Sequence, residues 1–300
     1  MEWFYNWFTE FPAMDKSALR ALKKSIDGGF RAWTREHGDT VEAFFEPIKQ
    51  MLIWSEKFLL TTPWPIILAG IVAIAWFASR SWKITLMTFV TMMLIGYFDM
   101  WDNTMRTISI MVVSTFVSIV LGIPIGIAMS KSDKLQSLIT PVLDVMQTMP
   151  GFVYLIPVVM LLGIGKVPGL LAVVIYAIPP IIRLTNLGIR MVDKEVLEAA
   201  DAFGSSAWQR LKNVQIPLAM PTIMAGINQT IMMALALVVI ASMIGVKGLG
   251  QPVLQAIANQ YFTLGMFNGL AIVGVAIIFD RVSQAYGKRL QSHSEEVHGK

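Results

Sequence analysis

Long stretches of this sequence contain no charged residue, and they constrain the fold more than any other feature. Residues 58–79 form the first such stretch, and residues 213–246 form the longest. Each is long enough for the roughly 20 residues that the hydrocarbon core of a bilayer demands. Only 15% of the residues are charged and 55% are hydrophobic, whereas a soluble domain is about a quarter charged. The chain is therefore expected to be a membrane protein.

The residue types present argue against several kinds of chemistry. There is no cysteine, so a disulfide, a thiolate nucleophile, an iron-sulfur cluster and a cysteine-ligated zinc are excluded. The histidines His37, His293 and His298 all lie in the polar ends. We therefore expect no catalytic residue, no metal site and no cofactor bound to this chain. The net charge of +4 reflects the basic excess typical of cytoplasmic loops, so membrane lipid and not nucleic acid is expected around it.

The apolar segments predict an all-α fold, a polytopic membrane helix bundle with about seven transmembrane helices. The expected spans are residues 58–79, 84–98, 107–130, 152–162, 167–187, 223–243 and 264–279. The third span contains Gly122 and Gly126, whose spacing of four residues allows close contact with another helix. Residues 248–262 are rich in Gly, Gln and Asn and are expected to form a re-entrant or surface helix buried in protein.

Basic residues in short loops predict the orientation of the chain. They concentrate in one set of loops, around residues 80–83, 131–134, 190–212 and 281–289, whereas the opposite set holds only Arg106, Lys166 and Lys247. We therefore expect the N-terminus outside and the C-terminus in the cytoplasm. The expected domains are an N-terminal extension over residues 1–57, a membrane domain over residues 58–290 and a polar cytoplasmic tail over residues 291–300.

Two amphipathic helices are predicted in the N-terminal extension. Residues 19–26 carry leucine and isoleucine at helical spacing, and the Gly28-Gly29 pair is expected to end this first helix. A second helix is expected to begin at Asp39 and to be kinked at Pro47. Both helices would suit a membrane surface or would pack on the protein's own helices.

The largest polar interruption of the membrane domain, residues 191–221, is predicted to fold as helix, turn, helix. Asp193 is placed to cap the first helix, and Gly204 is expected to end it. A capping box over residues 206–209 then begins a second helix, which Pro217 is expected to end. This loop is therefore a candidate for contact with a partner in the cytoplasm.

The amino-acid sequence of this loop resembles the EAA loop of permease subunits of bacterial ABC importers. Glu198-Ala199-Ala200 is followed by Gly204 and then by Val214-Gln-Ile-Pro217, with Val214 where the pattern usually has isoleucine. Over roughly residues 80–287, other segments are similar to the permeases of glycine betaine/proline-type osmoprotectant importers. These segments are residues 143–154, 163–169, 178–184, 218–230 and 239–244.

The resemblance implies a type I ABC importer permease fold in the bacterial inner membrane. It implies translocation of a small compatible solute such as glycine betaine, proline betaine, choline or a similar quaternary amine. The implied partners are ABC ATPase subunits that bind ATP and Mg, a soluble periplasmic or extracellular substrate-binding protein, and a second copy of the permease. The residues implied to couple to the ATPase are Glu198, Ala199, Ala200, Gly204 and Pro217.

The residue types in the loop agree with a docking role. Ala199 and Ala200 let a partner approach the helix backbone closely, Glu198 offers a carboxylate, and Gly204 supplies the positive φ that reverses the chain. The ATPase must be a separate subunit because this sequence has no G-x-x-x-x-G-K-[ST] phosphate loop. We therefore expect the loop to form a rigid plug for a groove in that subunit.

Polar residues at membrane depth form a second group of candidates. They are Asp144, Gln147, Asn186, Asn228 and Gln229. Each could line the translocation path of a polar zwitterion or form a hydrogen bond between helices. Arg183 lies near the end of a span, where its side chain is expected to reach the membrane surface.

An ion-coupled secondary transporter or channel for a small zwitterion is the alternative function. Such a protein would use charge within the membrane for coupling or selectivity, whereas these spans are nearly devoid of acidic and basic residues. An intramembrane enzyme would need a nucleophile with a base, or metal ligands. The sequence therefore favours the importer subunit.

Overall fold

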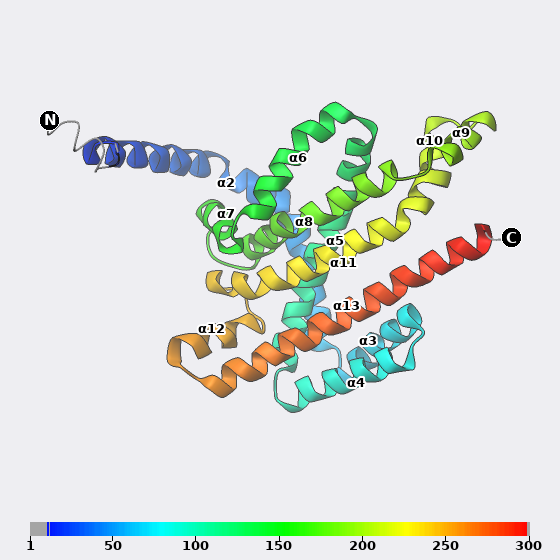
Figure 1. Cartoon of the computed structure of the whole chain (residues 1–300). Coiled ribbons are helices and arrows are strands. Elements are labelled where there is room, and N and C mark those ends of the chain that lie inside the picture. The colour runs from blue at the N-terminus through cyan, green and yellow to red at the C-terminus, as the bar shows by residue number, and fades with distance from the viewer. Residues whose placement is uncertain (1–10, 12, 299–300) are drawn as a thin grey trace.

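The computed structural model of the chain describes residue 11 and residues 13–298, and it describes side chains as far as Arg289. Figure 1 shows an assembly of helices, and no strand occurs among residues 13–298. The α-helices are α2 (Lys16–Thr61), α3 (Trp64–Ser79), α4 (Trp82–Tyr97), α5 (Trp101–Lys131), α6 (Asp133–Thr148), α7 (Leu155–Leu162), α8 (Lys166–Arg190), α9 (Lys194–Ala202), α10 (Ala207–Arg210), α11 (Ile216–Ala241), α12 (Gly250–Asn259) and α13 (Phe262–His298). The all-α prediction is confirmed.

Four helical segments of the described chain are long and apolar enough to cross a membrane by themselves. They are Trp101–Lys131, Lys166–Arg190, Ala207–Ile244 and Phe262–Arg289. Two bent pairs raise the number to as many as 6: α2 with α3, bent by 113°, and α6 with the segment ending in α7, bent by 110°. The helix α4, predicted as a span, has only 16 residues. The predicted count of about seven spans exceeds six because it included this short helix.

The N-terminal extension does not contain the two helices that its sequence predicted. One helix, α2, runs for 46 residues, and neither the Gly28-Gly29 pair nor Asp39 interrupts it. A glycine inside a helix costs only about 1 kcal/mol, which is too little to end a helix that has good partners further along. The helix ends at Thr61 instead, because Pro63 forces the residue before it into an extended conformation.

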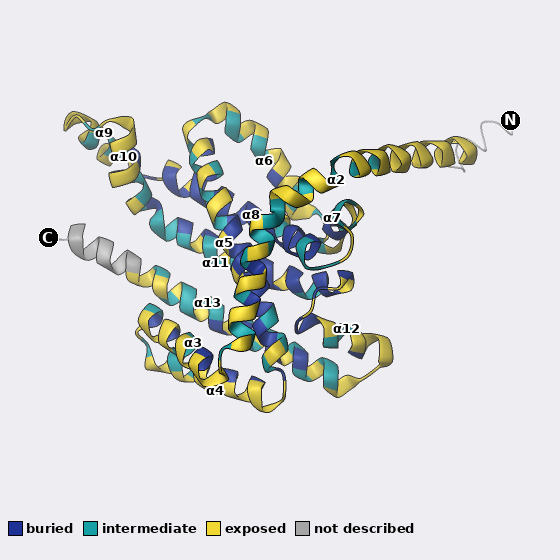
Figure 2. Cartoon of the chain, turned by 180° about the vertical axis from the view of Figure 1, so that it is seen from behind, coloured by how far each residue is buried: buried dark blue, intermediate teal, exposed yellow. Residues whose placement is uncertain are grey.

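The two halves of α2 lie in different surroundings. In Figure 2 its N-terminal half points away from the other helices and is exposed. The C-terminal half packs on α5 and α7, where Leu52 is buried and Ile48 and Met51 contact the core. The predicted domain boundary at residue 57 therefore falls inside an unbroken helix. At the other end, α13 continues without a break to His298, through most of the predicted tail.

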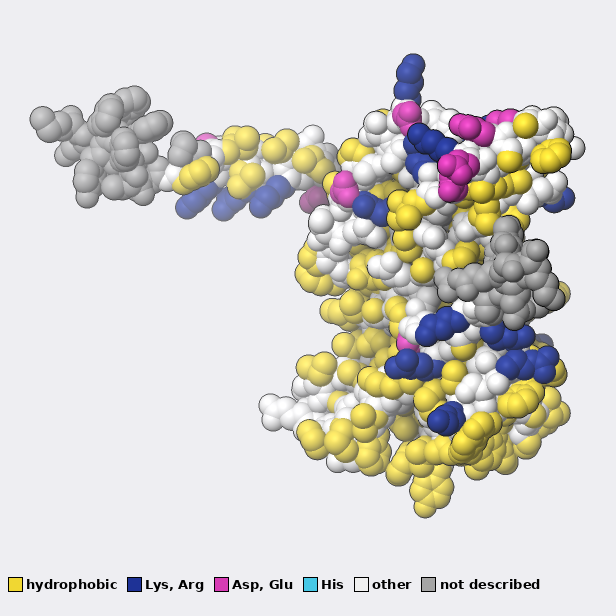
Figure 3. Space-filling model, turned by 45° about the vertical axis from the view of Figure 1, so that its right-hand side comes forward, with side chains coloured by type: hydrophobic (Ala, Val, Ile, Leu, Met, Phe, Trp, Pro, Cys, Tyr) yellow, Lys and Arg dark blue, Asp and Glu magenta, His cyan; other side chains and the backbone are white. Residues whose placement is uncertain are grey.

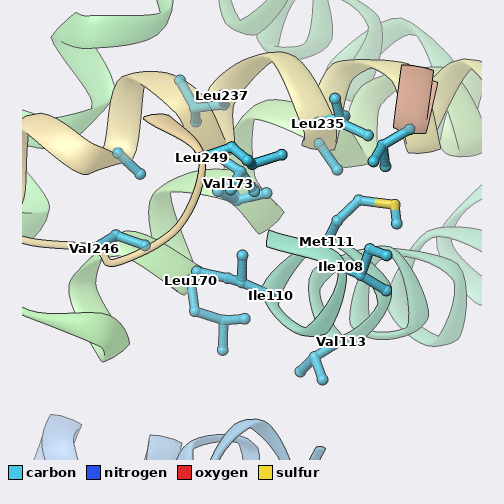
Figure 4. Close-up of a cluster of buried hydrophobic side chains, with 14 of the residues drawn as sticks. Ile108, Ile110, Met111, Val113, Leu170, Val173, Leu235, Leu237, Val246 and Leu249 are labelled. Atoms are coloured by element: carbon cyan, nitrogen blue, oxygen red, sulfur yellow. The ribbon is translucent and has the colours of Figure 1, made fainter. Parts of the chain in front are cut away.

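The core is centred on α8, which packs between α5 and α11 (Figure 4). In the most apolar 18-residue stretch of each helix, 67% is buried in α8 and 22% in α13. The contact with α5 depends on glycine. A Cβ atom at Gly122 would lie 2.4 Å from the Ile181 side chain, and one at Gly126 would lie 2.7 Å from the Ile182 carbonyl oxygen. The predicted close helix contact at these glycines is confirmed.

The outer surfaces of α3 and α4 are apolar. Trp64, Ile74, Phe77, Trp82 and Phe89 are all exposed. Figure 3 shows apolar side chains over the lower end of the molecule, basic side chains gathered just above them, and both acidic and basic side chains at the upper end. Exposed apolar area of this kind is what a membrane helix presents to lipid.

The glycine contact leads to a first prediction. Gly126→Ala should destabilise the protein by roughly 1 to 3 kcal/mol, because its methyl group meets the Ile182 carbonyl and the Thr185 side chain. The measurement is thermal unfolding of the purified protein in detergent. Gly70→Ala, in α3, is the matched control because nothing lies within 4 Å of a Cβ atom there. Equal melting temperatures for the two variants would contradict the close α5–α8 contact.

Candidate functional site

The polar loop between α8 and α11 folds as the sequence predicts over its first part. The Asp193 side chain accepts a hydrogen bond from the Glu195 N–H at 2.9 Å and caps α9. Gly204 has φ +76°, in the left-handed region that favours glycine. Ser206 and Gln209 then form a reciprocal capping box that begins α10. Helix, turn and helix are all confirmed.

Pro217 does not end the second helix, which corrects the prediction. The chain continues from α10 through a π-helical turn, Leu211–Gln215, into α11, where Pro217 lies in the first turn. Within the π turn the Ile216 N–H bonds to the carbonyl of Leu211, five residues back. Such a turn tolerates a residue without an N–H, since the regular ladder is already shifted there. One continuous helix, Ala207–Ile244, therefore joins the loop to the membrane core.

The α9/α10 hairpin, residues 194–210, stands clear of the bundle (Figure 1). No residue of α9 is buried, and Glu198 and Ala199 are exposed. An ion pair between Asp201 and Arg210 holds the two short helices together. The hairpin thus has an internal contact between its two helices and an outer surface that is open to a partner.

Two large aromatic side chains on the hairpin were not singled out by the sequence. Phe203 is 91% exposed and Trp208 is 65% exposed. Both stand beside the turn at Gly204, in a part of the chain that should lie in water. Large exposed aromatic side chains in such a place commonly mark a contact surface.

The polar candidates at membrane depth fall into separate places. Asp144 on α6 forms an ion pair with Arg183 on α8, so Arg183 has a carboxylate partner where the sequence predicted only a side chain reaching the surface. Gln147, one turn further along α6, is exposed. The Asp144–Arg183 pair therefore ties α6 to α8.

Asn186 is buried in α8 and belongs to a structural network. Its Oδ1 accepts a hydrogen bond from the Arg190 Nε at 3.1 Å. Arg190 also donates to the Met129 carbonyl at 3.0 Å and pairs with Asp133 at 2.7 Å. The network joins the adjacent ends of α5, α6 and α8, and it occupies Asn186 in holding them.

Asn228 and Gln229 line a recess of about 390 Å³ between α11 and α13. The Asn228 Nδ2 donates to Asp280 Oδ1 at 3.1 Å, and Ser283 donates to the Asn228 Oδ1. Of the five predicted pathway residues, only these two share a cavity among those described. The sequence did not point to Asp280 and Ser283 because both follow the last apolar stretch, one and four residues beyond the predicted span.

A buried carboxylate on α2 was also missed. The Glu56 side chain is 10% exposed and accepts from Arg106 at 2.7 Å and from Lys166 at 2.5 Å. Arg106 lies in the second turn of α5 and Lys166 is the first residue of α8, so one carboxylate joins three helices. Its position four residues after the buried Leu52, on the same helical face, is a signal that the sequence does contain.

No three His, Cys, Asp or Glu side chains among those described converge in a way that could hold a metal ion. The carboxylate of Asp280 is instead hydrogen-bonded to two amides, and that of Glu56 is paired with two cations. Each of these carboxylates therefore links different helices.

Comparisons with known proteins agree with this geometry. Residues 118–292 match the family described as "Binding-protein-dependent transport system inner membrane component". The chain is 45% identical to the glycine betaine/carnitine transport permease protein GbuB of Listeria monocytogenes over 89% of this chain and 92% of that one. It is 44% identical to the glycine betaine/proline betaine transport system permease protein ProW of Escherichia coli, over 96% and 84% of the two chains.

Two further likenesses extend the comparison. The glycine betaine transport system permease protein OpuAB of Bacillus subtilis is 48% identical over 73% of this chain and 78% of that one. Among solved structures, an inward-facing conformation of the MetNI methionine ABC transporter has a TM-score of 0.57 at 19% identity, covering 62% of this chain and 93% of that chain. At this identity the structural likeness concerns the fold alone.

Proposed function

The chain belongs to the family of inner membrane components of binding-protein-dependent transport systems, and from this membership we propose the details of its transport cycle. It is the membrane-spanning permease subunit of an ABC importer, a multi-pass protein of the inner membrane. The ion-coupled transporter or channel is not favoured.

The solute we propose is a small quaternary-ammonium zwitterion of the glycine betaine type. The printed names of GbuB, ProW and OpuAB have glycine betaine in common. The apolar bundle holds few charged groups, which suits a solute whose own charges cancel. Proline betaine, carnitine and choline are the nearest alternatives in chemistry.

ATP hydrolysis is assigned to a separate pair of ABC ATPase subunits, which would bind ATP and Mg. The observation that carries this assignment is the α9/α10 hairpin, an exposed rigid element with a glycine at φ +76°. Glu198, Ala199 and Ala200 would meet the ATPase groove. Pro217 lies in the first turn of α11, which leads away from the hairpin toward the membrane core. Its proposed role is therefore to begin α11 and not to contact the ATPase.

Two further partners complete the proposed importer. A soluble substrate-binding protein outside the membrane would deliver the solute, as the description of the family indicates. A second copy of this chain would form the other half of the path. The basic loops support an orientation with the hairpin in the cytoplasm and the start of α2 outside.

The orientation can be tested by thiol labelling, since the chain has no cysteine of its own. Single cysteines at Ser17, Ser132 and Ser205 are treated with a membrane-impermeant reagent on intact cells. Only Ser17→Cys should react, because it alone is placed outside. Permeabilised cells serve as the control in which all three react. Reaction of Ser205→Cys in intact cells would overturn the orientation and the docking role of the hairpin.

The coupling role is tested at Gly204. A valine there would carry roughly 1 to 3 kcal/mol of backbone strain and would redirect α9, while the helices in the membrane keep their packing. Gly204→Val should insert normally but abolish stimulation of ATP hydrolysis by loaded binding protein. Ala200→Trp should do the same by steric exclusion at the docking face.

The matched control for these variants is Gly70→Val in α3, where a side chain meets nothing within 4 Å. It should retain stimulated ATP hydrolysis and uptake at equal expression. If Gly204→Val and Ala200→Trp both transported as well as this control, the hairpin would not be the coupling element.

A further inference from the structure

The recess between α11 and α13 combines apolar walls with a few polar groups. We call it the α11/α13 recess. It is lined by Pro221, Met224, Ala225, Asn228, Gln229, Met232, Ser283, Gln284, Gly287 and Lys288. Its volume of about 390 Å³ is near the lower end of the range for small-molecule sites. A larger hollow of about 630 Å³ among α2, α5, α6, α7 and α8 is lined by apolar side chains and offers no group for a charged solute.

A carboxylate is fixed beside the recess. Asp280 Oδ1 accepts from the Asn228 amide at 3.1 Å and from the Gln284 amide at 2.6 Å. Both amides belong to lining residues, so the carboxylate is held against the lining by two hydrogen bonds. No described group donates to its other oxygen, Oδ2. Asp280 is not itself a lining residue, so its negative charge lies directly behind the wall that Asn228 and Gln284 form.

A positive charge stands at the other end of the recess. Lys288 is exposed and forms no ion pair with any carboxylate whose side chain the structure describes. It follows Asp280 by eight residues on the same helix, a rise of roughly 12 Å. Because helical side chains lean toward the N-terminus, the ammonium of Lys288 can approach Asp280 across the recess.

The polar part of the recess lining is a poor match for lipid. Gln229 is exposed in this single chain, although it lies in the helix Ala207–Ile244, which is long and apolar enough to cross the membrane. Polar side chains at such depth face a water-filled cavity or another protein surface. In an importer with a second copy of this chain, the recess would open toward the path between the two copies.

We infer that the α11/α13 recess is a low-affinity binding site for the transported zwitterion, in which the negative charge of Asp280, behind Asn228 and Gln284, attracts the quaternary ammonium and Lys288 binds the carboxylate. The inference rests on the proposed function and specifies where the solute pauses. A quaternary ammonium has no N–H to donate, so a carboxylate and the soft sulfur-containing walls at Met224 and Met232 suit it. The binding is weak because a site on a path must release its solute.

The test uses the permease with its ATPase subunits in lipid nanodiscs, without binding protein. Saturation-transfer NMR measures contact with the methyl groups of glycine betaine and, separately, of choline, which lacks a carboxylate. Glycine betaine should give a signal at millimolar concentrations of the solute, as expected for weak binding. Asp280→Asn should weaken binding of both solutes about tenfold, the scale for loss of one charged contact.

Lys288→Gln distinguishes the two ends of the solute. It should weaken glycine betaine binding about tenfold and leave choline binding unchanged. Arg281→Gln is the matched control, since Arg281 is an exposed charge on α13 that does not line the recess. It should leave binding of both solutes as in the wild type.

Several results would overturn the inference. They are the absence of a wild-type signal, an unchanged signal in Asp280→Asn, or equal losses for both solutes in Lys288→Gln. ATP-driven uptake by the same preparation, supplied with binding protein, separates this failure from a failure of the proposed function. If the wild type takes up the solute normally but the variants bind it as the wild type does, only the binding site in the recess is ruled out. If the wild type shows no uptake, the importer assignment itself is ruled out.

Discussion

The close packing of α8 against α5 and α11 is the contact on which the rest of the structure depends. In hydrocarbon, every backbone N–H and C=O must be paired within its own helix, so helices associate through side-chain fit and close approach. Because Gly122 and Gly126 have no side chain, α5 lies very close to α8. A Cβ atom at Gly122 would collide with Ile181, and one at Gly126 would collide with Thr185. This contact fixes α8 at the centre. The α9/α10 hairpin follows its end directly, and the long helix Ala207–Ile244 returns along its side.

That return helix links the two regions proposed to act in transport, the α9/α10 hairpin and the α11/α13 recess. It begins in the hairpin at Ala207, passes the π turn without interruption and reaches Asn228 in the wall of the α11/α13 recess. A movement of the hairpin driven by ATPase subunits would therefore reach the recess through one continuous helix. Glu56 closes the opposite end of the bundle by holding the starts of α5 and α8 to α2. The two ends of the bundle are thus held by different contacts, one by the buried carboxylate of Glu56 and the other by the Arg190 network.

The sequence predicted features that depend on local chemistry and missed those that depend on distant contacts. The charge-free stretches, the Asp193 cap, the capping box at Ser206 and the positive φ at Gly204 follow from a few neighbouring residues. The continuity of α2 through Gly28 does not, because the packing of its far half decides it. The partners of Asp144, Asn186 and Glu56 lie on other helices, so only the fold could reveal which polar residues hold the bundle and which line a cavity.

The most direct test of the account is reconstituted transport. Purified permease is placed in proteoliposomes with its ATPase subunits, with ATP inside, binding protein outside and radiolabelled glycine betaine as the solute. The account predicts accumulation of the label only when permease, ATPase, ATP and binding protein are all present, with no response to an imposed ion gradient. Accumulation by the permease alone, driven by a sodium or proton gradient, would contradict it.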